Sequence, residues 1–393
     1  MKTNSKITIF VAIFFFLLFS FFSLNVSTVF GEENPNLSIL NSTENSSTYA
    51  KAMVLIEAES GRVLYQKNCN ERLPMASTTK IMTAYVALKH TNDLDEKFVV
   101  DERSVGIEGT SLYLRKGEEK TLRELLFGLM LPSGNDCAVA IACKISGSEE
   151  EFVKLMNEEA RILGLENTNF ANSHGLDEEN HFTSAFDLAK ITAKAMENET
   201  FKEIVGTKNI TVSGNSEVQA KPLKNKNKLL WQMDSCEGVK TGFTDNAKRC
   251  FVASAKENEM RLICVVLNCG PMFEEAKRFL ELGFANYKMY NLLKSYSPNR
   301  AVAVENGKTD FVETLTQKHF SFPLTEKEFQ QVEYEISLPT SIEAPIEKEQ
   351  ELGFLKIKLN GNVLFEEKIY AMEQVESTKF FDKVEEIIDY WNI

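Results

Sequence analysis

The sequence lacks an excess of basic residues. Its 393 residues include 44 lysines and arginines against 57 aspartates and glutamates, and the formal net charge is −13. Proteins that bind nucleic acid carry a basic patch or stripe. The charge therefore argues against nucleic acid as a partner, and it says little about a small or neutral ligand.

The chain also lacks Cys-x-x-Cys pairs and the Cys/His spacing that is typical of zinc sites. We expect neither a metal nor another cofactor. The seven cysteines are an odd number, so complete disulfide pairing would leave one of them free. Cys137 and Cys143 lie in an apolar stretch with helical character, and Cys264 lies in a strand-like run. Because free cysteine behaves as a small buried apolar residue, we expect buried thiols.

The N-terminus carries a long apolar run. Two early lysines precede this run at residues 7–24, and Val29-Phe30-Gly31 offers a cleavage site. The pattern predicts a secretory signal peptide over residues 1–31, followed by a polar linker at residues 32–47. The alternative is an uncleaved membrane anchor, because about 18 apolar residues just span a bilayer. In both cases we expect the rest of the chain to be exported.

The length of the chain predicts two domains rather than one. Residues 48–292 mix helical and strand patterns, with two strands flanking a turn at Ser60-Gly61. Residues 296–372 alternate apolar and polar residues, and Asn360-Gly361 is a strong β-hairpin signal. We therefore predict an α+β domain with an antiparallel sheet, followed by a small all-β domain.

The last segment, residues 377–393, predicts an amphipathic helix. Its apolar stripe consists of Phe380, Phe381, Val384, Ile387, Ile388 and Trp391. Tyr390 and Trp391 favour the boundary between membrane and water. The segment is too short and too charged to span a bilayer, so we predict an anchor on the outer face of the membrane. The alternative is that the stripe packs on the β domain of the same chain.

The first motif with catalytic potential is "MASTTK", which places Ser77 and Lys80 one helical turn apart. A serine hydroxyl is a weak nucleophile at neutral pH and needs a base. A lysine becomes such a base when burial or a neighbouring cation destabilises its ammonium form. Ser-x-x-Lys also arises by chance, and a solvated helix start is the alternative.

The second motif, Ser133-Gly134-Asn135, interrupts an apolar helical region. Glycine permits a sharp turn, so Ser133 and Asn135 can point into a cleft as a proton relay and an amide donor. A plain turn between two helices is the alternative. The triplet recurs at Ser213-Gly214-Asn215, where the polar surroundings predict an exposed hairpin turn.

The third motif, Lys240-Thr241-Gly242, lies in "EGVKTGFT". Lys240 offers a cation and Thr241 a hydroxyl, which suit a substrate carboxylate. A strand glycine lets a ligand backbone approach closely, as when a peptide adds itself to a sheet. A basic hairpin turn is the alternative.

The order Ser-x-x-Lys, Ser-Gly-Asn, Lys-Thr-Gly is close to that of class A β-lactamases and penicillin-binding proteins. Over residues 48–390 the chain resembles the low-molecular-mass penicillin-binding proteins that are D-alanyl-D-alanine carboxypeptidases. The blocks "ASTTKIMTA", "LPSGNDCAVAIA", "NSHGLDEENHFTSAFDLAKI" and "VKTGFT" carry the resemblance. It implies a penicillin-binding/β-lactamase-like catalytic domain and covalent inhibition by β-lactam antibiotics.

The resemblance implies roles for the first two motifs. Ser77 attacks the carbonyl between the two terminal D-alanines of a peptidoglycan stem peptide, and Lys80 takes its proton. Ser133 and Asn135 extend the proton path and hold the substrate amide. Free D-alanine leaves, and water then cleaves the acyl-enzyme.

The third motif is implied to bind the substrate. Lys240 and Thr241 receive the terminal carboxylate, and Gly242 lets the substrate backbone approach the strand. The backbone N–H of Phe243 completes an oxyanion hole with that of Ser77. Phe243 stands where some relatives have histidine. The family often places an arginine beyond this strand, and the segment "LNCGPMFEEAKRF" offers none before its last two residues.

Two further residues lie in segments that line the site in the family. His174 is a possible site residue, and its alternative is to hold a loop. Asp187 is expected to cap a helix.

Three other functions remain to be weighed. A serine β-lactamase of class A needs a Glu-x-x-x-Asn motif, which is missing between Asn135 and Lys240. A silent wall-binding module keeps the fold without catalysis, yet every motif residue is present here. A DD-endopeptidase that cuts cross-links is not separated by motif. The prediction is a serine-type D-Ala-D-Ala carboxypeptidase.

Overall fold

The structure of the protein is a computed structural model, and it describes residues 47–91, 93–213 and 220–378. The predicted signal peptide, nearly all of the predicted linker and most of the predicted C-terminal helix lie outside the described residues. The predictions for these three segments therefore stay predictions. Gly214 and Asn215 of the second Ser-Gly-Asn triplet also lie outside them.

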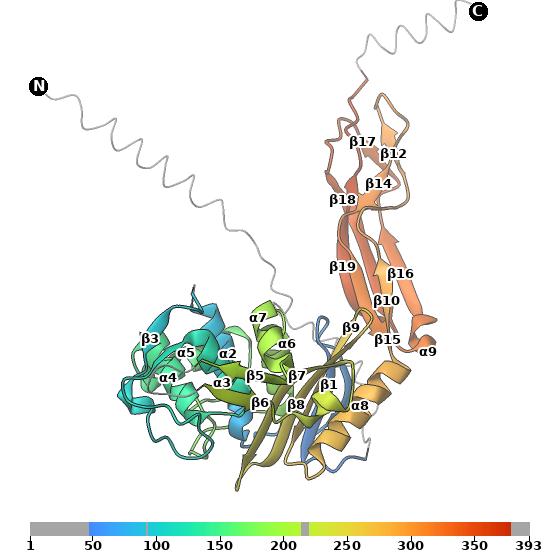
Figure 1. Ribbon diagram of the computed structural model, residues 1–393. Helices are drawn as coiled ribbons and strands as arrows, with labels where there is room; N and C mark the ends of the chain where they lie inside the picture. Colours follow the sequence, from blue (N-terminus) through green and yellow to red (C-terminus); the bar gives the residue numbers. More distant parts are fainter. Residues whose placement is uncertain (1–46, 92, 214–219, 379–393) are drawn as a thin grey trace, which may run out of the picture. The chain divides into compact units, whose positions relative to one another are not determined.

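A five-stranded sheet lies at the centre of the chain that precedes residue 287 (Figure 1). Its order is β2-β1-β9-β8-β7, with β1 Ala52–Glu57, β2 Val63–Lys67, β7 Cys236–Thr244, β8 Lys248–Glu257 and β9 Met260–Leu267. All neighbouring strands are antiparallel, as predicted. The predicted turn at Ser60-Gly61 joins β1 to β2, and Gly61 has the positive φ of 68° that suits glycine there.

Helices cover both faces of this sheet. Helix α8 Met272–Asn286 packs on β8 and β9, and α6 Ala185–Ala195 packs on β1 and β9. Successive strand side chains point to opposite faces. Ile263 and Cys264 are nevertheless both fully buried, so β9 has no solvent face. This confirms the predicted strand-like run around Cys264.

A group of further helices packs beside the sheet. It consists of α2 Lys80–Lys89, α3 Leu122–Met130, α4 Asn135–Ser146, α5 Glu149–Ile162 and α7 Glu199–Gly206, with the 3₁₀ turns η2 Ala76–Thr79, η3 Glu102–Ser104 and η4 Lys228–Trp231. Two short ladders pair β3 Lys97–Val99 with β4 Glu119–Thr121 and β5 Asn209–Val212 with β6 Lys221–Lys224. A capping box between Thr121 and Glu124 starts α3, and the predicted break between α3 and α4 is confirmed.

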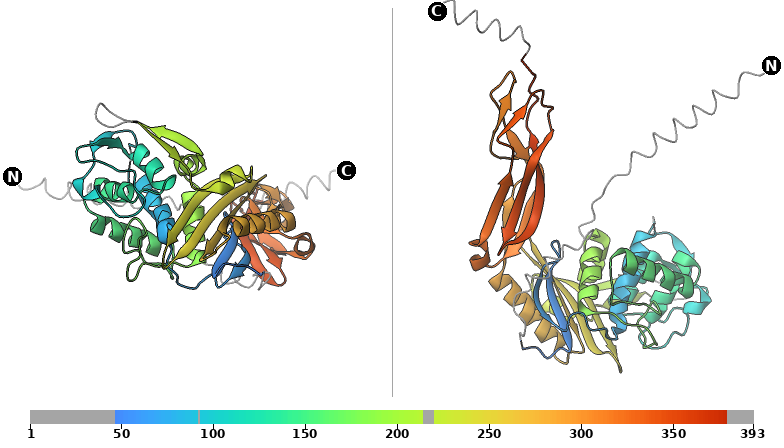
Figure 2. Two further views of the ribbon diagram at one scale, coloured as in Figure 1. Left: turned by 60° about the horizontal axis from the view of Figure 1, so that its bottom comes forward. Right: turned by 180° about the vertical axis from the view of Figure 1, so that it is seen from behind.

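The C-terminal part of the chain is rich in strands (Figure 2). Strand β10 Lys288–Leu293 pairs with β15 Phe320–Leu324. A sheet of order β11-β14-β19-β18-β16 contains β11 Ser297–Pro298, β14 Thr314–Thr316, β16 Val332–Ser337, β18 Glu351–Leu359 and β19 Asn362–Ala371. A third sheet contains β13 Phe311–Val312, β12 Val302–Glu305 and β17 Ser341–Glu343. One short helix, α9 Glu326–Phe329, makes this part β-rich rather than all-β.

The predicted hairpin at Asn360-Gly361 joins β18 to β19. Both residues have positive φ, 51° and 81°, as a tight type I′ turn requires. Near the hairpin the apolar residues of the two strands face one core, which includes Leu355, Ile357 and Ile369, while Leu352 and Ala371 at the far ends belong to a second core. The alternating pattern of the sequence thus gives the observed pairing.

All seven cysteines are free thiols. Five of them are buried, as expected, and Cys143 and Cys236 are half-buried. Burial raises the pKa of Cys264 and of Cys137, because a thiolate is poorly solvated in an apolar interior. These thiols act as packing residues.

Candidate active site

Ser77 and Lys80 meet at the junction of η2 and α2. Ser77 lies in η2, and Lys80 is the first residue of α2. The distance between Lys80 Nζ and Ser77 Oγ is 3.0 Å. Lys80 is 0% exposed, although lysine is almost never buried without a partner. The alternative of a solvated helix start is therefore wrong.

The Nζ atom of Lys80 has two further contacts. It donates to Asn135 Oδ1 at 2.7 Å and to the backbone carbonyl of His174 at 2.5 Å. Burial lowers the pKa of Lys80 to about 7, and the charge of Lys226 acts in the same direction. A neutral amine has two N–H donors and one lone pair. With both donors on carbonyl oxygens, the lone pair is left for the hydroxyl proton of Ser77.

The second motif forms the turn between α3 and α4. Ser133 has a φ of +76°, a strained value for a residue with a β-carbon, and the backbone N–H of Gly134 donates to the carbonyl of Gly128 at 2.9 Å. Asn135 starts α4, and its Nδ2 donates to the carbonyl of Glu108 at 2.6 Å. This bond orients Asn135 Oδ1 toward Lys80.

The hydroxyl of Ser133 has no hydrogen-bond partner among the described residues, although its oxygen is buried. Buried polar atoms are usually paired, so an unpaired one marks a functional candidate. The buried hydroxyl is compatible with the predicted place of Ser133 in a proton path.

The third motif lies on β7, which is the edge strand of the central sheet. Lys240 is buried, and its Nζ donates to the carbonyl of Thr241 at 3.0 Å. Burial lowers the pKa of Lys240 well below its ordinary value, and the charges of Lys80 and Lys226 lower it further. The three lysines therefore lie close enough together for each positive charge to disfavour the others. The strand also continues past the motif, so the alternative of a basic hairpin turn is wrong.

Gly242 brings β7 against Ser77. A β-carbon at this position would lie 3.1 Å from the backbone nitrogen of Ser77 and 3.1 Å from the carbonyl oxygen of Met75. A side chain here would push the strand away from η2. The next residue, Phe243, is 61% exposed, so only its backbone faces this contact region.

His174 touches the site through its backbone and not through its ring. The carbonyl accepts from Lys80, while the ring Nδ1 accepts from the N–H of Leu176 at 3.2 Å. The ring Nε2 lies 3.6 Å from Glu149 Oε1. The side chain thus holds a loop, and the carbonyl is the part that reaches Lys80.

Asp187 does not cap its helix. Ser184 is the cap of α6, and the carboxylate of Asp187 accepts from the N–H of Asn167 at 2.7 Å and from Thr168 Oγ1 at 2.8 Å. The expected structural role is right, but the carboxylate ties down the 167–168 segment.

Three residues near the site were missed in the sequence. His181 Nε2 lies 2.8 Å from Thr79 Oγ1. Asp177 accepts from Thr244 Oγ1 at 2.7 Å and so joins its loop to the end of β7. Lys226 places a third positive charge near the two motif lysines. The only sequence signal was that His181 and Asp177 fall inside the block "NSHGLDEENHFTSAFDLAKI".

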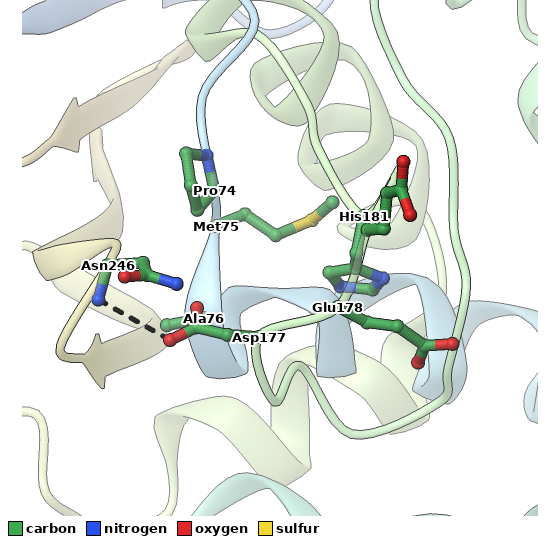
Figure 3. A pocket seen from close by; sticks show the side chains of 8 residues that line it. Pro74, Met75, Ala76, Asp177, Glu178, His181 and Asn246 are labelled. Carbon is green, nitrogen blue, oxygen red and sulfur yellow. Dashed lines mark hydrogen bonds between the residues drawn. The ribbon is translucent and has the colours of Figure 1, made fainter.

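A pocket of about 320 Å³ lies beside the residues that precede Ser77 (Figure 3). It is lined by Pro74, Met75, Ala76, Asp177, Glu178, Glu179, His181 and Asn246. Figure 3 shows the backbone N–H of Asn246 donating to Asp177. The lining does not include Ser77, Lys80 or Lys240, so the pocket adjoins the reactive groups without containing them.

Comparison with protein families gives two matches along the chain. The model described as D-alanyl-D-alanine carboxypeptidase matches residues 40–270. The model described as penicillin-binding protein 5, C-terminal domain, matches residues 287–377. The first match contains all three motifs.

Individual proteins are similar along most of the chain. The D-alanyl-D-alanine carboxypeptidase DacF of Bacillus subtilis is 38% identical over 351 residues, which are 87% of this chain and 90% of that protein. DacA of Escherichia coli is 33% identical over 359 residues, which are 87% of this chain and 86% of that protein. The crystal structure of penicillin binding protein 5 from Haemophilus influenzae has a TM-score of 0.72 at 29% identity, covering 85% of this chain and all of that one. The first family model covers more than half of the residues of this chain, and the similar proteins extend over both matched segments. This chain therefore belongs to the serine-type D-alanyl-D-alanine carboxypeptidases of the penicillin-binding protein 5 group.

Proposed function

We propose that the protein removes the terminal D-alanine from peptidoglycan stem pentapeptides through an acyl-enzyme on Ser77. One observation carries this assignment. Lys80 is fully buried, and its Nζ contacts two carbonyl oxygens and, at 3.0 Å, the hydroxyl oxygen of Ser77. That arrangement suits a neutral amine acting as a base.

Acylation begins when Lys80 Nζ takes the hydroxyl proton and Ser77 Oγ bonds to the carbonyl carbon of the penultimate D-alanine. The carbonyl electron pair moves to its oxygen, which the backbone N–H groups of Ser77 and Phe243 stabilise. The C–N bond then breaks, and the proton passes through the Ser133 hydroxyl to the leaving amine. Free D-alanine departs, and Ser77 holds the shortened peptide as an ester.

Deacylation uses the same groups in a second round. Lys80 takes a proton from water, and the hydroxide attacks the ester carbon. The C–O bond to Ser77 breaks, and the proton returns to Ser77 Oγ. The products are the tetrapeptide and the free enzyme, and no cofactor enters either step.

Lys240 and Thr241 are the proposed site for the terminal carboxylate of the substrate. Lys240 forms no ion pair among the described residues, so its burial as an ammonium is unfavourable without a ligand. An incoming carboxylate raises the pKa of Lys240, because an opposite charge favours the charged form. The bound substrate therefore localises the positive charge on Lys240 and leaves Lys80 as the neutral base.

The proposed location is the outer face of the cytoplasmic membrane or the space beyond it. The signal peptide pattern supports export, and the apolar stripe within residues 377–393 supports a surface anchor. Across residues 47–91, 93–213 and 220–378, none of the helices has the length and apolar character needed to cross a membrane.

The direct test uses a stem pentapeptide that ends in D-Ala-D-Ala. The purified protein should shorten it by one alanine, as read by mass spectrometry, and the Ser77→Ala variant should leave it intact. A fluorescent penicillin should label the wild-type peptide that contains Ser77. Cleavage of cross-linked dimers alone would indicate an endopeptidase, and rapid turnover of penicillin would indicate a β-lactamase; either result would overturn the proposal.

A further inference from the structure

Ala76, directly before the nucleophile, has a strained backbone. Its φ is +49°, in the left-handed region that glycine adopts readily and alanine does not. Such a conformation is unfavourable for a residue with a β-carbon. It persists only where the surroundings enforce it. Since Ser77 is the next residue, the conformation of Ala76 sets the direction in which the nucleophile points.

Ala76 is enclosed by two glycines. A β-carbon on Gly175 would lie 2.1 Å from the carbonyl oxygen of Ala76, and one on Gly242 would lie 3.1 Å from its β-carbon. These segments therefore close tightly around the residue. They exclude other conformations by contact, but they do not offer a hydrogen bond that favours the observed one.

Besides the backbone bond expected within the 3₁₀ turn η2, the carbonyl of Ala76 accepts a hydrogen bond from the side chain of Thr79. The distance from Thr79 Oγ1 to the carbonyl oxygen is 2.8 Å. A threonine hydroxyl can rotate, so this bond alone is weakly directed. Thr79 Oγ1 is also 2.8 Å from His181 Nε2, and both side chains are buried.

The ring of His181 determines which atom donates in each hydrogen bond of the series that runs from Ala171 through His181 and Thr79 to Ala76. The backbone N–H of Ala171 donates to His181 Nδ1 at 3.0 Å, so Nδ1 is the acceptor and Nε2 carries the proton. Nε2 then donates to Thr79 Oγ1, which leaves the hydroxyl proton of Thr79 for the carbonyl of Ala76. Burial lowers the pKa of His181 to about 4, so the neutral ring persists at neutral pH.

We propose that His181 is a positioning residue for the nucleophile. Through Thr79 it fixes the carbonyl of Ala76, and with it the left-handed turn that directs Ser77 Oγ to Lys80. The role is not visible from the motifs, because His181 lies 104 residues beyond Ser77 in the sequence. The inference rests on the proposed acylation of Ser77.

The test compares Thr79→Val, which removes the hydroxyl and keeps the shape, with Thr79→Ser, which keeps the hydroxyl. A matched control is Thr192→Val, because Thr192 is also buried and donates to a carbonyl within its own helix, that of Leu188 at 2.7 Å. His181→Leu removes the ring nitrogens. For each variant, stopped-flow labelling with a fluorescent penicillin gives the acylation rate constant, and a urea titration gives the stability.

We expect Thr79→Val and His181→Leu to acylate at least about tenfold more slowly, in line with the sensitivity of catalysis to misplaced groups. Thr79→Ser should stay within about threefold of wild type, and Thr192→Val should lose stability with an unchanged rate. The pH midpoint of acylation should not move in any variant, since Lys80 is intact. Equal rates in Thr79→Val and wild type would overturn the inference, as would a Thr79→Ser defect as large as that of Thr79→Val. Failure of wild type to be labelled would instead overturn the proposed function.

Discussion

The pH dependence of Ser77 acylation tests whether Lys80 is the base. With a pKa of about 7, about half of the Lys80 side chains are neutral at pH 7 and about one in a hundred at pH 5. The rate constant should fall roughly 50-fold between these values and rise no more than about twofold above pH 7. An ordinary lysine would be neutral in only about one molecule in 2,500 at pH 7, so burial raises the population of the base about 10³-fold.

The assay is stopped-flow labelling of the purified protein by a fluorescent penicillin between pH 5 and pH 9. Lys80→Arg provides the comparison, because a guanidinium keeps the positive charge and does not lose its proton in this range. A general base contributes about 10²–10⁴-fold to a rate, so the variant should retain at most about one hundredth of the wild-type rate.

Lys240 is also buried, and a control must separate the two lysines. Lys240→Arg keeps a fixed positive charge at that position, so its pH profile should still show the step assigned to Lys80. A wild-type rate that is constant from pH 5 to pH 9, or near-normal acylation of Lys80→Arg, would refute the reasoning. The base would then lie elsewhere.

Three further outcomes follow from the structure. A stem peptide amidated at its C-terminus should react at least about tenfold more slowly, because Lys240 loses its carboxylate partner. An unchanged kcat/KM would refute the assignment of Lys240 to the substrate carboxylate. Arg62→Ala should lower the free energy of unfolding by about 3–5 kcal/mol in a urea titration, because it removes a buried cation that pairs with Glu328. Arg103→Ala, at an exposed ion pair, should lower it by less than about 1 kcal/mol in the same titration. A chain cut after Glu376 should cease to float with lipid vesicles while it still hydrolyses soluble peptide, and equal flotation of both forms would exclude the anchor.

The parts of the fold that the sequence predicts are those with local causes. The hairpin at Asn360-Gly361 needs two residues that tolerate positive φ, and the sequence supplies both. The break at Ser133-Gly134 follows from a proline and a glycine between two apolar helical stretches. The continuous apolar run of β9 predicts a strand covered on both faces. Each of these signals lies within about ten residues.

The parts that the sequence did not predict depend on contacts between distant segments. The contact between His181 and Thr79 spans 102 residues, and no periodicity or spacing indicates it. The carbonyl of His174 reaches Lys80, and a carbonyl carries no sequence signal at all. The two-residue strands β11 and β13 are defined only by their partners. Motif order predicted the candidate site residues, and tertiary packing decides how they are held.

The buried base also gives the protein a stability that depends on pH. Because the pKa of Lys80 falls from about 10.5 to about 7 on folding, the unfolded chain binds more protons between these values, and stability rises with pH across this window. The contribution amounts to about 2 kcal/mol between pH 7 and pH 9. Lys80→Met removes it. The variant also leaves two carbonyl acceptors unpaired, at a cost that does not vary with pH.

The readout is therefore the difference in unfolding free energy between wild type and Lys80→Met, measured in urea at pH 7, 8 and 9. The buried thiols titrate on unfolding in both proteins, so their opposite trend cancels in the difference. The unfolding free energy of wild type, relative to that of the variant, should rise by about 2 kcal/mol from pH 7 to pH 9. A difference that stays constant with pH would mean that Lys80 keeps its proton in the folded protein. Lys80 would then not be the neutral amine that the proposed acylation of Ser77 requires.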